Sequence, residues 1–305
     1  MTTPRQIIGM IGIGQLGLPI AINLIKAGYK VVGYRRNDRE AFAAFGVEAK
    51  DSVAAVTRES DVLLLCLPNE KSQLDILEQP SGVLANLKSG QVIIELGTYR
   101  REFKLDQARK IEALGGLVLE AEVSGSPPMV GERKAALYIG GRQDVLTQCS
   151  AILEAITAHR FHLGDYGSAV SMKLIANQLL TIHTLAAAEA INLGVSAGFD
   201  PQQVVEVIKQ GAGGSTMFSI RGPLMASRRF VPAPGPFDTL EKYLDLAGEM
   251  ASNLGCATPL FSASVPYFRR ALEGGMGGED ISAVIKFIEA DSALQKLNKP
   301  NKEIQ

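Results

Sequence analysis

The feature that most constrains the fold is a regular alternation, up to about residue 163, of short β-branched apolar runs with helical patterns of roughly 10–15 residues. The apolar runs cover residues 6–11, 30–34, 61–67, 91–96, 117–123, 135–139 and 159–163. This alternation is typical of repeated βαβ units, in which helices join parallel strands. It predicts an N-terminal α/β domain with a Rossmann-type, doubly wound parallel sheet.

The alternation stops after Gly164. The remainder reads as helices separated by turns rich in glycine and proline, at residues 211–214, 232–236 and 274–278. We therefore expect two domains, an α/β domain over residues 1–164 and an all-α C-terminal domain over residues 165–305.

One stretch of the second domain is almost free of charge. Between residues 167 and 199 the only charged side chains are Lys173 and Glu189, so a helix there should be buried on nearly every side. A membrane span of about 20 apolar residues is excluded because polar residues interrupt it. They are Asn177, Gln178, Thr181, His183 and Thr184. Such a helix should pack against another subunit, which predicts a homodimer or a dimer of dimers.

Composition removes several classes of function. The 305 residues are 46% hydrophobic, and 31 Lys and Arg balance 32 Asp and Glu, so the net charge of −1 favours neither nucleic acid nor an anionic membrane as a partner. The three cysteines and three histidines show no metal-ligand spacing, so we expect no metal. The N-terminus shows no secretory signal, which predicts a cytoplasmic protein.

A glycine motif opens the first domain. Gly12-x-Gly14-x-x-Gly17 directly follows the first apolar run and begins a helical pattern. The first glycine permits a tight turn, the second lets the backbone approach a pyrophosphate, and the third lets helix and strand pack closely. The motif therefore predicts a dinucleotide site at the helix N-terminus. We expect the contacts of this site to come from Gly12, Ile13, Gly14, Gln15, Leu16 and Gly17.

Arg35 and Arg36 follow the second apolar run, where an acidic residue would bind the adenosine ribose of NAD. Two guanidinium groups there suit a 2′-phosphate instead, so we expect NADP, with NAD less favoured. The alternative is a solvated pair of arginines that Asp38 and Glu40 could partner.

Two further sets of residues indicate a substrate site. Lys173 and Asn177 lie four residues apart in the nearly uncharged stretch, so both project from one helical face and could bind one small polar ligand. Alternatively, Lys173 extends to solvent and Asn177 is a satisfied core amide. The turn Ser124-Gly125-Ser126 ends a predicted strand, and its N–H groups and hydroxyls could hold a carboxylate.

Together these blocks resemble the β-hydroxyacid dehydrogenase family, from Gly9 to about residue 289. Residues 120–126 resemble the family's substrate motif, and residues 167–177 its catalytic motif, with Lys173 and Asn177 in the catalytic positions. The resemblance further implies cofactor contacts from Leu67-Pro68-Asn69 and Thr98. It also implies that Lys242 contacts the nicotinamide and the substrate.

The chain departs from the family pattern at several positions. Glu122 replaces a proline, Ser126 a glycine, Ala169 a glycine and Tyr243 an aspartate, and residues 129, 133 and 134 carry Met, Arg and Lys in place of small residues. These changes leave the catalytic pair intact but could reshape the acyl pocket.

The resemblance implies an NADP-dependent enzyme that moves hydride between the nicotinamide and a short 3-hydroxy acid or semialdehyde. Lys173 would act as general acid or base. Two alternatives remain open: an NADPH-dependent reductase similar to imine reductases, and a non-catalytic module that only binds NADP.

Overall fold

The computed structural model describes residues 6–37 and 40–297, and it divides into two compact units, residues 1–173 and 174–305. The division falls inside the long helix α9 (Ser168–Ser196), a little beyond the boundary predicted after Gly164. Each unit is described by itself below.

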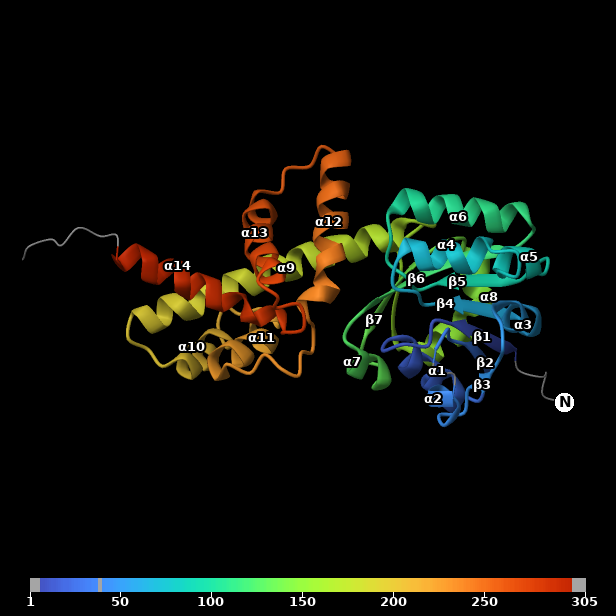
Figure 1. The fold of residues 1–305 in the computed structure, drawn as a ribbon, viewed down its shortest axis with the longest axis horizontal. Helices are drawn as coiled ribbons and strands as arrows, with labels where there is room; N and C mark the ends of the chain where they lie inside the picture. Colours follow the sequence, from blue (N-terminus) through green and yellow to red (C-terminus); the bar gives the residue numbers. More distant parts are fainter. Residues whose placement is uncertain (1–5, 38–39, 298–305) are drawn as a thin grey trace, which may run out of the picture. The chain divides into compact units, whose positions relative to one another are not determined.

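Unit 1 is built on one eight-stranded sheet with the order β3-β2-β1-β4-β5-β6-β7-β8 (Figure 1). The strands are β1 (Ile7–Ile11), β2 (Lys30–Tyr34), β3 (Glu48–Ala49), β4 (Val62–Leu65), β5 (Val92–Glu95), β6 (Leu117–Ser124), β7 (Ala136–Gly140) and β8 (His159–His162). All seven predicted runs contain a strand. The two-residue β3 carries no apolar run and was not predicted. Every pairing is parallel except that of β6 with β7, which the alternating pattern did not reveal.

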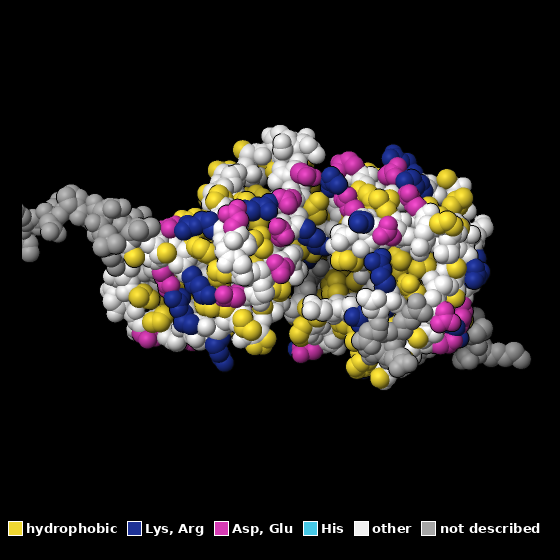
Figure 2. All heavy atoms as spheres, in the orientation of Figure 1, with side chains coloured by type: hydrophobic (Ala, Val, Ile, Leu, Met, Phe, Trp, Pro, Cys, Tyr) yellow, Lys and Arg dark blue, Asp and Glu magenta, His cyan; other side chains and the backbone are white. Residues whose placement is uncertain are grey.

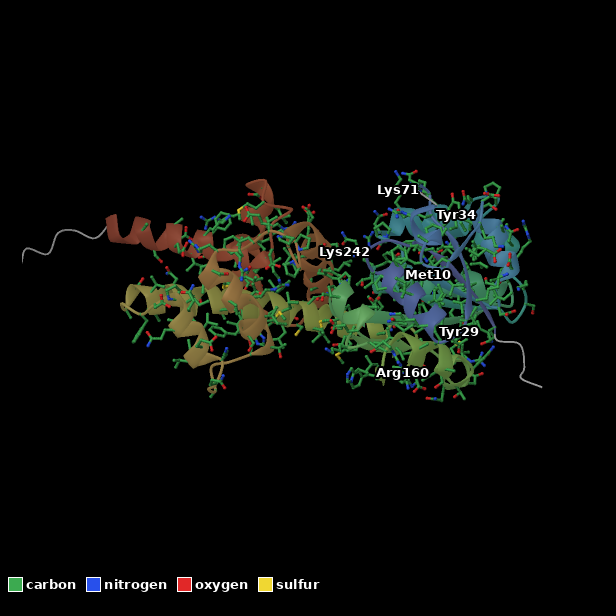
Figure 3. All side chains as sticks on the ribbon, turned by 90° about the horizontal axis from the view of Figure 1, so that it is seen from below. Met10, Tyr29, Tyr34, Lys71, Arg160 and Lys242 are labelled. Atoms are coloured by element: carbon green, nitrogen blue, oxygen red, sulfur yellow. The ribbon has the colours of Figure 1, made fainter. Side chains whose placement is uncertain are left out.

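Helices cover both faces of this sheet, as Figure 1 shows. They are α1 (Gly17–Lys26), α2 (Glu40–Ala43), α3 (Val53–Glu59), α4 (Glu70–Glu78), α5 (Val83–Asn86), α6 (Arg101–Ala113), α7 (Pro127–Gly131) and α8 (Gln143–Ile156). Alternate strand residues point to opposite faces, so Met10, labelled in Figure 3, packs in the cluster with α1, α2, α7 and α8, whereas Ile11 packs with α3, α4, α5 and α6. Burial on both faces explains why the central strands read as continuous apolar runs.

The strand order also brings distant segments of the chain together. Strands β2, β1, β4, β5 and β6 are neighbours in that order and run parallel, so their carboxyl ends meet along one edge of the sheet. Ligands of open α/β sheets bind at this edge. The segments that follow these five strands are therefore the first place to look for a site.

The described part of unit 2, residues 174–297, is built of helices. It comprises the rest of α9 with α10 (Pro201–Ile208), α11 (Thr216–Ser227), α12 (Phe237–Asn253), α13 (Pro259–Glu273), the short 3₁₀ helix η1 (Ile281–Val284) and α14 (Ile285–Leu297). The buried Arg221 of α11 pairs with Asp280, which also accepts hydrogen bonds from the backbone of Gly235 and Ser282. This ion pair joins α11 to the loops before α12 and η1.

The prediction that α9 is buried on nearly every side is wrong for the chain taken alone. Only 33% of its most apolar 18-residue window is buried, and Leu193 is 71% exposed. By length and composition, α9 is the one helix in the described part of the chain that could cross a membrane. Its interrupting polar residues, such as Asn177 and Thr181, remain the reason to predict that it does not.

Candidate active site

The glycine turn after β1 has the geometry that a bound pyrophosphate requires. Gly12 has φ of +93°, and a Cβ atom there would lie 2.2 Å from the carbonyl oxygen of Cys66. A Cβ at Gly17 would lie 2.2 Å from the carbonyl oxygen of Gly12. A Cβ at Gly14, in contrast, would have no protein atom within 4 Å, so this position is the one that offers space to a ligand. The three glycines thus divide into two that pack against the chain and one that faces open space.

Helix α1, which begins at Gly17, has no side chain capping its N-terminus and no acidic residue in its first turn. Its first N–H groups and its positive dipole end are therefore suited to an anion that the protein itself does not supply. The residues present fit the diphosphate of a pyridine dinucleotide.

Arg35 and Arg36 follow β2, next to the glycine turn along the same edge. The guanidinium of Arg36 lies 3.9 Å from the carboxylate of Asp75, and both side chains are largely exposed. An exposed pair at this distance contributes little, so Arg36 can exchange it for a phosphate. Of the two acidic residues considered as partners for the arginines, Asp38 lies outside the described residues, and the side chain of Glu40 does as well.

Two loops continue the edge on the other side of β1. The segment Leu67-Pro68-Asn69 follows β4, and Thr98 follows β5. Tyr99, which is almost fully buried, joins them because its hydroxyl donates to the carbonyl oxygen of Leu67 at 2.9 Å. Its ring also explains Gly97, since a Cβ there would lie 2.2 Å from the Tyr99 hydroxyl. Sequence reasoning did not select Tyr99, and only the adjacency of β4 and β5 reveals its role.

The turn Ser124-Gly125-Ser126 follows β6, the next strand along the edge. The Nζ of Lys173 donates a hydrogen bond to the carbonyl oxygen of Val123 at 2.7 Å, although the two residues are 50 positions apart in the sequence. The side chain of Lys173 does not extend to solvent, since the residue is only 8% exposed. The ammonium group therefore lies at the start of the turn that the sequence suggested for a carboxylate.

Asn177 and Lys242 belong to unit 2. Asn177 lies one helical turn beyond Lys173 on α9, and its buried Nδ2 has no hydrogen-bond partner among the described residues, so it is not the satisfied core amide considered above. An unpartnered amide of this kind is suited to a polar ligand. Lys242, labelled in Figure 3, lies on α12 with its ammonium 5.2 Å from the centre of the Tyr243 ring.

Beneath the edge lies a group of buried charges that sequence reasoning missed. Lys104 of α6 is fully buried, and its Nζ lies 2.6 Å from Glu122 and 3.2 Å from Glu120, both fully buried on β6. Burial lowers the pKa of Lys104, but the two carboxylates outweigh this effect, so its pKa is raised and the ammonium stays charged. Two glutamates at alternate positions of a buried strand require a cation, and this is the signal that could have pointed to Lys104.

The two carboxylates hold different parts of the site. Glu120 accepts hydrogen bonds from the backbone N–H groups of Gly167 and Ala169, at 2.7 and 2.6 Å, and so caps the start of the helix that carries Lys173. Glu122 accepts a hydrogen bond from the hydroxyl of Thr98 at 2.5 Å. The unexpected Glu122 is therefore joined to a predicted cofactor residue.

A third carboxylate, Glu95 at the end of β5, accepts hydrogen bonds from the side chain of Gln73 and from the backbone N–H of Gly97. Burial raises its pKa to about 8, against an opposing effect from Lys104. Glu95 is thus protonated at neutral pH. The described residues contain no group of three or more His, Cys, Asp and Glu side chains that could hold a metal ion.

Comparisons with known proteins identify the family to which both parts of the chain are similar. Residues 7–164 match the family described as the NAD binding domain of 6-phosphogluconate dehydrogenase. Residues 167–288 match the family described as the NAD-binding domain of NADP-dependent 3-hydroxyisobutyrate dehydrogenase.

Similar proteins cover nearly the whole chain. An L-threonate dehydrogenase of Cupriavidus necator is 32% identical over 92% of this chain and 95% of its own length. A chloroplastic glyoxylate/succinic semialdehyde reductase of Arabidopsis thaliana is 30% identical over 93% of this chain and 79% of its own length. Among solved structures, 3-hydroxyisobutyrate dehydrogenase of Mycobacterium tuberculosis with L-serine has a TM-score of 0.84 and 25% identity, over 93% of this chain and 99% of that one.

Proposed function

Because this chain belongs to the β-hydroxyacid dehydrogenase family and is a pyridine-nucleotide-dependent oxidoreductase, we propose that it uses NADP(H) to interconvert a short 3-hydroxy acid and the corresponding semialdehyde. In this proposal Lys173 is the general acid and base. The relatives described above are named for small hydroxy acids or semialdehydes, which supports a small substrate that carries a carboxylate and a carbonyl. No observation favours the alternatives of imine reduction or of non-catalytic NADP binding.

One observation carries the proposal. The ammonium of Lys173 is buried and is held 2.7 Å from the carbonyl oxygen of Val123, directly before the Ser124-Gly125-Ser126 turn. A substrate whose carboxylate binds this turn would present its reacting oxygen to a cation a short distance away. An ammonium fixed in a poorly solvated site both stabilises negative charge on that oxygen and transfers a proton.

Each proposed residue has a separate task. The bound nicotinamide supplies or accepts the hydride. Ser124 and Ser126 would bind the substrate carboxylate with their hydroxyls, and Gly125, with φ of +155°, allows the backbone to turn there. Lys173 would give its proton to the carbonyl oxygen during reduction and take it back during oxidation. Asn177 would orient the substrate through its unpartnered amide, and Lys242 would hold the substrate and the nicotinamide.

The preference for NADP over NAD is supported by Arg35 and Arg36 at the end of β2 and by the absence of an acidic residue at position 35. A guanidinium binds a phosphate by two parallel, charge-assisted hydrogen bonds.

The direct test is a panel of C3–C5 semialdehydes and cyclic imines, each assayed for NADPH oxidation. The proposal predicts turnover of at least one carboxylated aldehyde and none of the imines. Turnover of imines alone would support the reductase alternative. NADPH binding without turnover of any compound would support a binding module.

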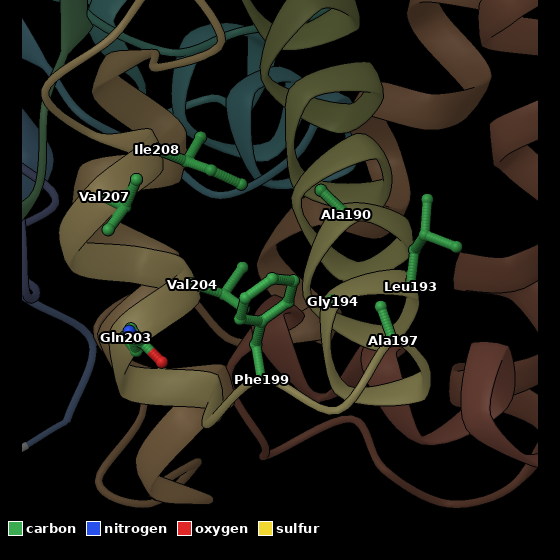
Figure 4. A pocket seen from close by; sticks show the side chains of 9 residues that line it. All are labelled: Ala190, Leu193, Gly194, Ala197, Phe199, Gln203, Val204, Val207 and Ile208. Carbon is green, nitrogen blue, oxygen red and sulfur yellow. The ribbon is translucent and has the colours of Figure 1, made fainter.

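We also propose that the protein is a homodimer or a dimer of dimers. An apolar pocket of about 390 Å³ lies between the end of α9 and α10 in unit 2 (Figure 4). Around it Leu193, Phe199 and Val207 are each more than half exposed, which is unfavourable for a monomer in water. Figure 2 shows one face of the molecule, on which positive and negative side chains are interspersed.

This surface yields a first prediction. Light scattering should give the wild-type protein a multiple of the 32.6 kDa chain mass, and Leu193→Glu should shift it to the monomer mass, because a carboxylate would be buried at the interface. Leu254→Glu is the matched control, since Leu254 is equally exposed (74%) but does not line the pocket. A wild-type protein of 32.6 kDa contradicts the proposal.

A further inference from the structure

The contact between Glu122 and Thr98 restricts what Thr98 can bind. A hydroxyl group has one proton, and the Thr98 hydroxyl lies 2.5 Å from Glu122 Oε2. A carboxylate that carries no proton only accepts hydrogen bonds, so the single proton of Thr98 must point toward Glu122. The oxygen of Thr98 is then left with lone pairs alone and acts toward any ligand as an acceptor.

Lys104 makes this arrangement possible. Glu122 is fully buried, and a buried carboxylate is unfavourable unless a cation and hydrogen-bond donors contact it. The Nζ of Lys104 lies 2.6 Å from Glu122 Oε1, on the other oxygen from the one that Thr98 contacts. The same Nζ donates to the carbonyl oxygen of Gly97 at 2.9 Å, directly before Thr98. Lys104 is thus the counter-ion of Glu122 and also holds the backbone of the Thr98 loop.

The arrangement depends on a residue at which the sequence departs from the pattern that it resembles. Position 122 is one of the departures from the family pattern, which has a proline there. A proline side chain accepts no hydrogen bond, so it would leave the hydroxyl at position 98 able to rotate and to donate. The replacement by glutamate, together with a buried lysine on α6, changes the role of a residue whose own identity is unchanged.

We infer that Glu122, paired with Lys104, is a positioning residue that makes Thr98 an obligatory hydrogen-bond acceptor for an O–H or N–H group of the nicotinamide half of the cofactor. The inference rests on the proposed function, in which the cofactor extends from the glycine turn past the ends of β4 and β5. The ligand donor is a hydroxyl of the nicotinamide ribose or the N–H of the carboxamide.

The test is a double-mutant cycle of Glu122→Gln and Thr98→Val, with the Kd of NADPH measured by its fluorescence and kcat/KM measured in parallel. In Glu122→Gln the amide oxygen faces the Lys104 ammonium, so the NH₂ group faces Thr98 and turns its proton toward the ligand. Each single variant should raise the Kd of NADPH by about 10-fold, the effect expected from the loss of one hydrogen bond. The double variant should be no weaker than the weaker single variant, because both changes remove the same bond.

Several arms locate the effect. Thr98→Ser, which keeps the hydroxyl, should bind NADPH as the wild type does. The Kd of 2′,5′-ADP, which is only the adenosine half, should stay unchanged in every variant. If the acetylpyridine analogue of the cofactor, which lacks the amide N–H, is insensitive to Thr98→Val, the donor is the carboxamide, and if it is sensitive, the donor is the ribose. Additive losses in the cycle, or unchanged NADPH binding in Glu122→Gln, would overturn the inference.

A further variant separates positioning from stability. Replacing all three charges by neutral residues, as Lys104→Met with Glu122→Leu and Glu120→Gln, should leave the melting temperature close to that of the wild type, because no buried charge is left unpaired. NADPH should nevertheless bind about 10-fold more weakly, since Thr98 has lost its proton acceptor. Lys110→Met, an exposed lysine of the same helix, is the control and should change neither quantity. Wild-type NADPH affinity in this triple variant would show a purely structural role. If no substrate is turned over, the proposed function fails, while the binding measurements still decide this inference.

Discussion

The two halves of the carboxyl edge of the sheet are built in opposite ways. At the end of β1 the site is made of backbone and empty space, because a Cβ at Gly14 would meet no protein atom within 4 Å. At the ends of β5 and β6, in contrast, charged side chains are packed beneath the site, among them the fully buried Lys104, Glu120 and Glu122. One half therefore leaves space that suits an anion, whereas the other holds buried charges in fixed contacts with one another.

The largest effect should come from removing the ammonium group of Lys173. Lys173→Ala should lower kcat by about 10²–10⁴-fold, the contribution of a positioned general acid, and should leave the Kd of NADPH nearly unchanged. Steady-state kinetics together with fluorescence titration would measure both quantities. The exposed lysine variant Lys71→Ala serves as the control, and equal turnover in Lys173→Ala would remove Lys173 from the mechanism.

The second prediction concerns the protonation of Glu95 at the end of β5. Because burial raises the pKa of Glu95 from 4.5 to about 8, the folded protein keeps a proton between these values that the unfolded chain releases. The contribution of Glu95 to stability is therefore complete below pH 4.5 and is lost as the pH rises toward 8, by about 1.4 kcal/mol per unit. Glu95→Gln, which is neutral at every pH, should gain about 3 kcal/mol relative to the wild type between pH 6 and pH 8.

Urea unfolding at a series of pH values would measure this gain. The exposed Glu102→Gln on α6 is the control and should follow the wild-type curve. Parallel curves for Glu95→Gln and the wild type would mean that Glu95 is ionised in the folded state, with Lys104 serving three carboxylates rather than two.

The third prediction distinguishes the roles of Gly12 and Gly14 in the turn after β1. Gly12→Ala should destabilise the fold by about 2 kcal/mol or more, since φ of +93° is unfavourable for alanine and its Cβ would overlap the Cys66 carbonyl. Gly14→Ala should leave the free energy of unfolding unchanged but weaken NADPH, because its Cβ would enter the space for the diphosphate. Thermal unfolding and fluorescence titration would test both variants. Equal losses of stability in the two variants would mean that Gly14 does not face a ligand site.

The same contrast explains how much could be read from the sequence. The fold, the strand positions and the glycine turn were predicted because their requirements are local: alternating apolar runs, and glycines at fixed spacing after the first run. The group around Lys104 was not, because α6, β5 and β6 contribute to it from separate parts of the chain. Glu122 was noticed only as a departure from a motif, and nothing local indicated that it contacts Thr98.

The prediction that α9 is buried failed for a related reason. An uncharged stretch predicts burial, but composition does not say what covers the helix, and within this chain two thirds of its apolar window remains uncovered. Similarly, the antiparallel pairing of β6 with β7 depends on the short connection through α7, and an alternation of apolar runs and helices does not reveal the direction of a strand. Sequence patterns thus predict whether a segment is helix or strand more readily than they predict what it packs against or pairs with.

The smallest predicted effect is at the adenosine end of the edge. Arg36→Ala should raise the KM for NADPH by about 10-fold and leave the KM for NADH nearly unchanged, because only NADPH carries the 2′-phosphate that the guanidinium would bind. Arg35→Asp should add repulsion of the phosphate and shift the preference further toward NADH. Arg58→Ala, on α3 and away from this edge, is the control, because its guanidinium already contacts Asn86. If both cofactors lose affinity equally, the arginines are structural, and discrimination between NADPH and NADH would have to come from elsewhere along the edge.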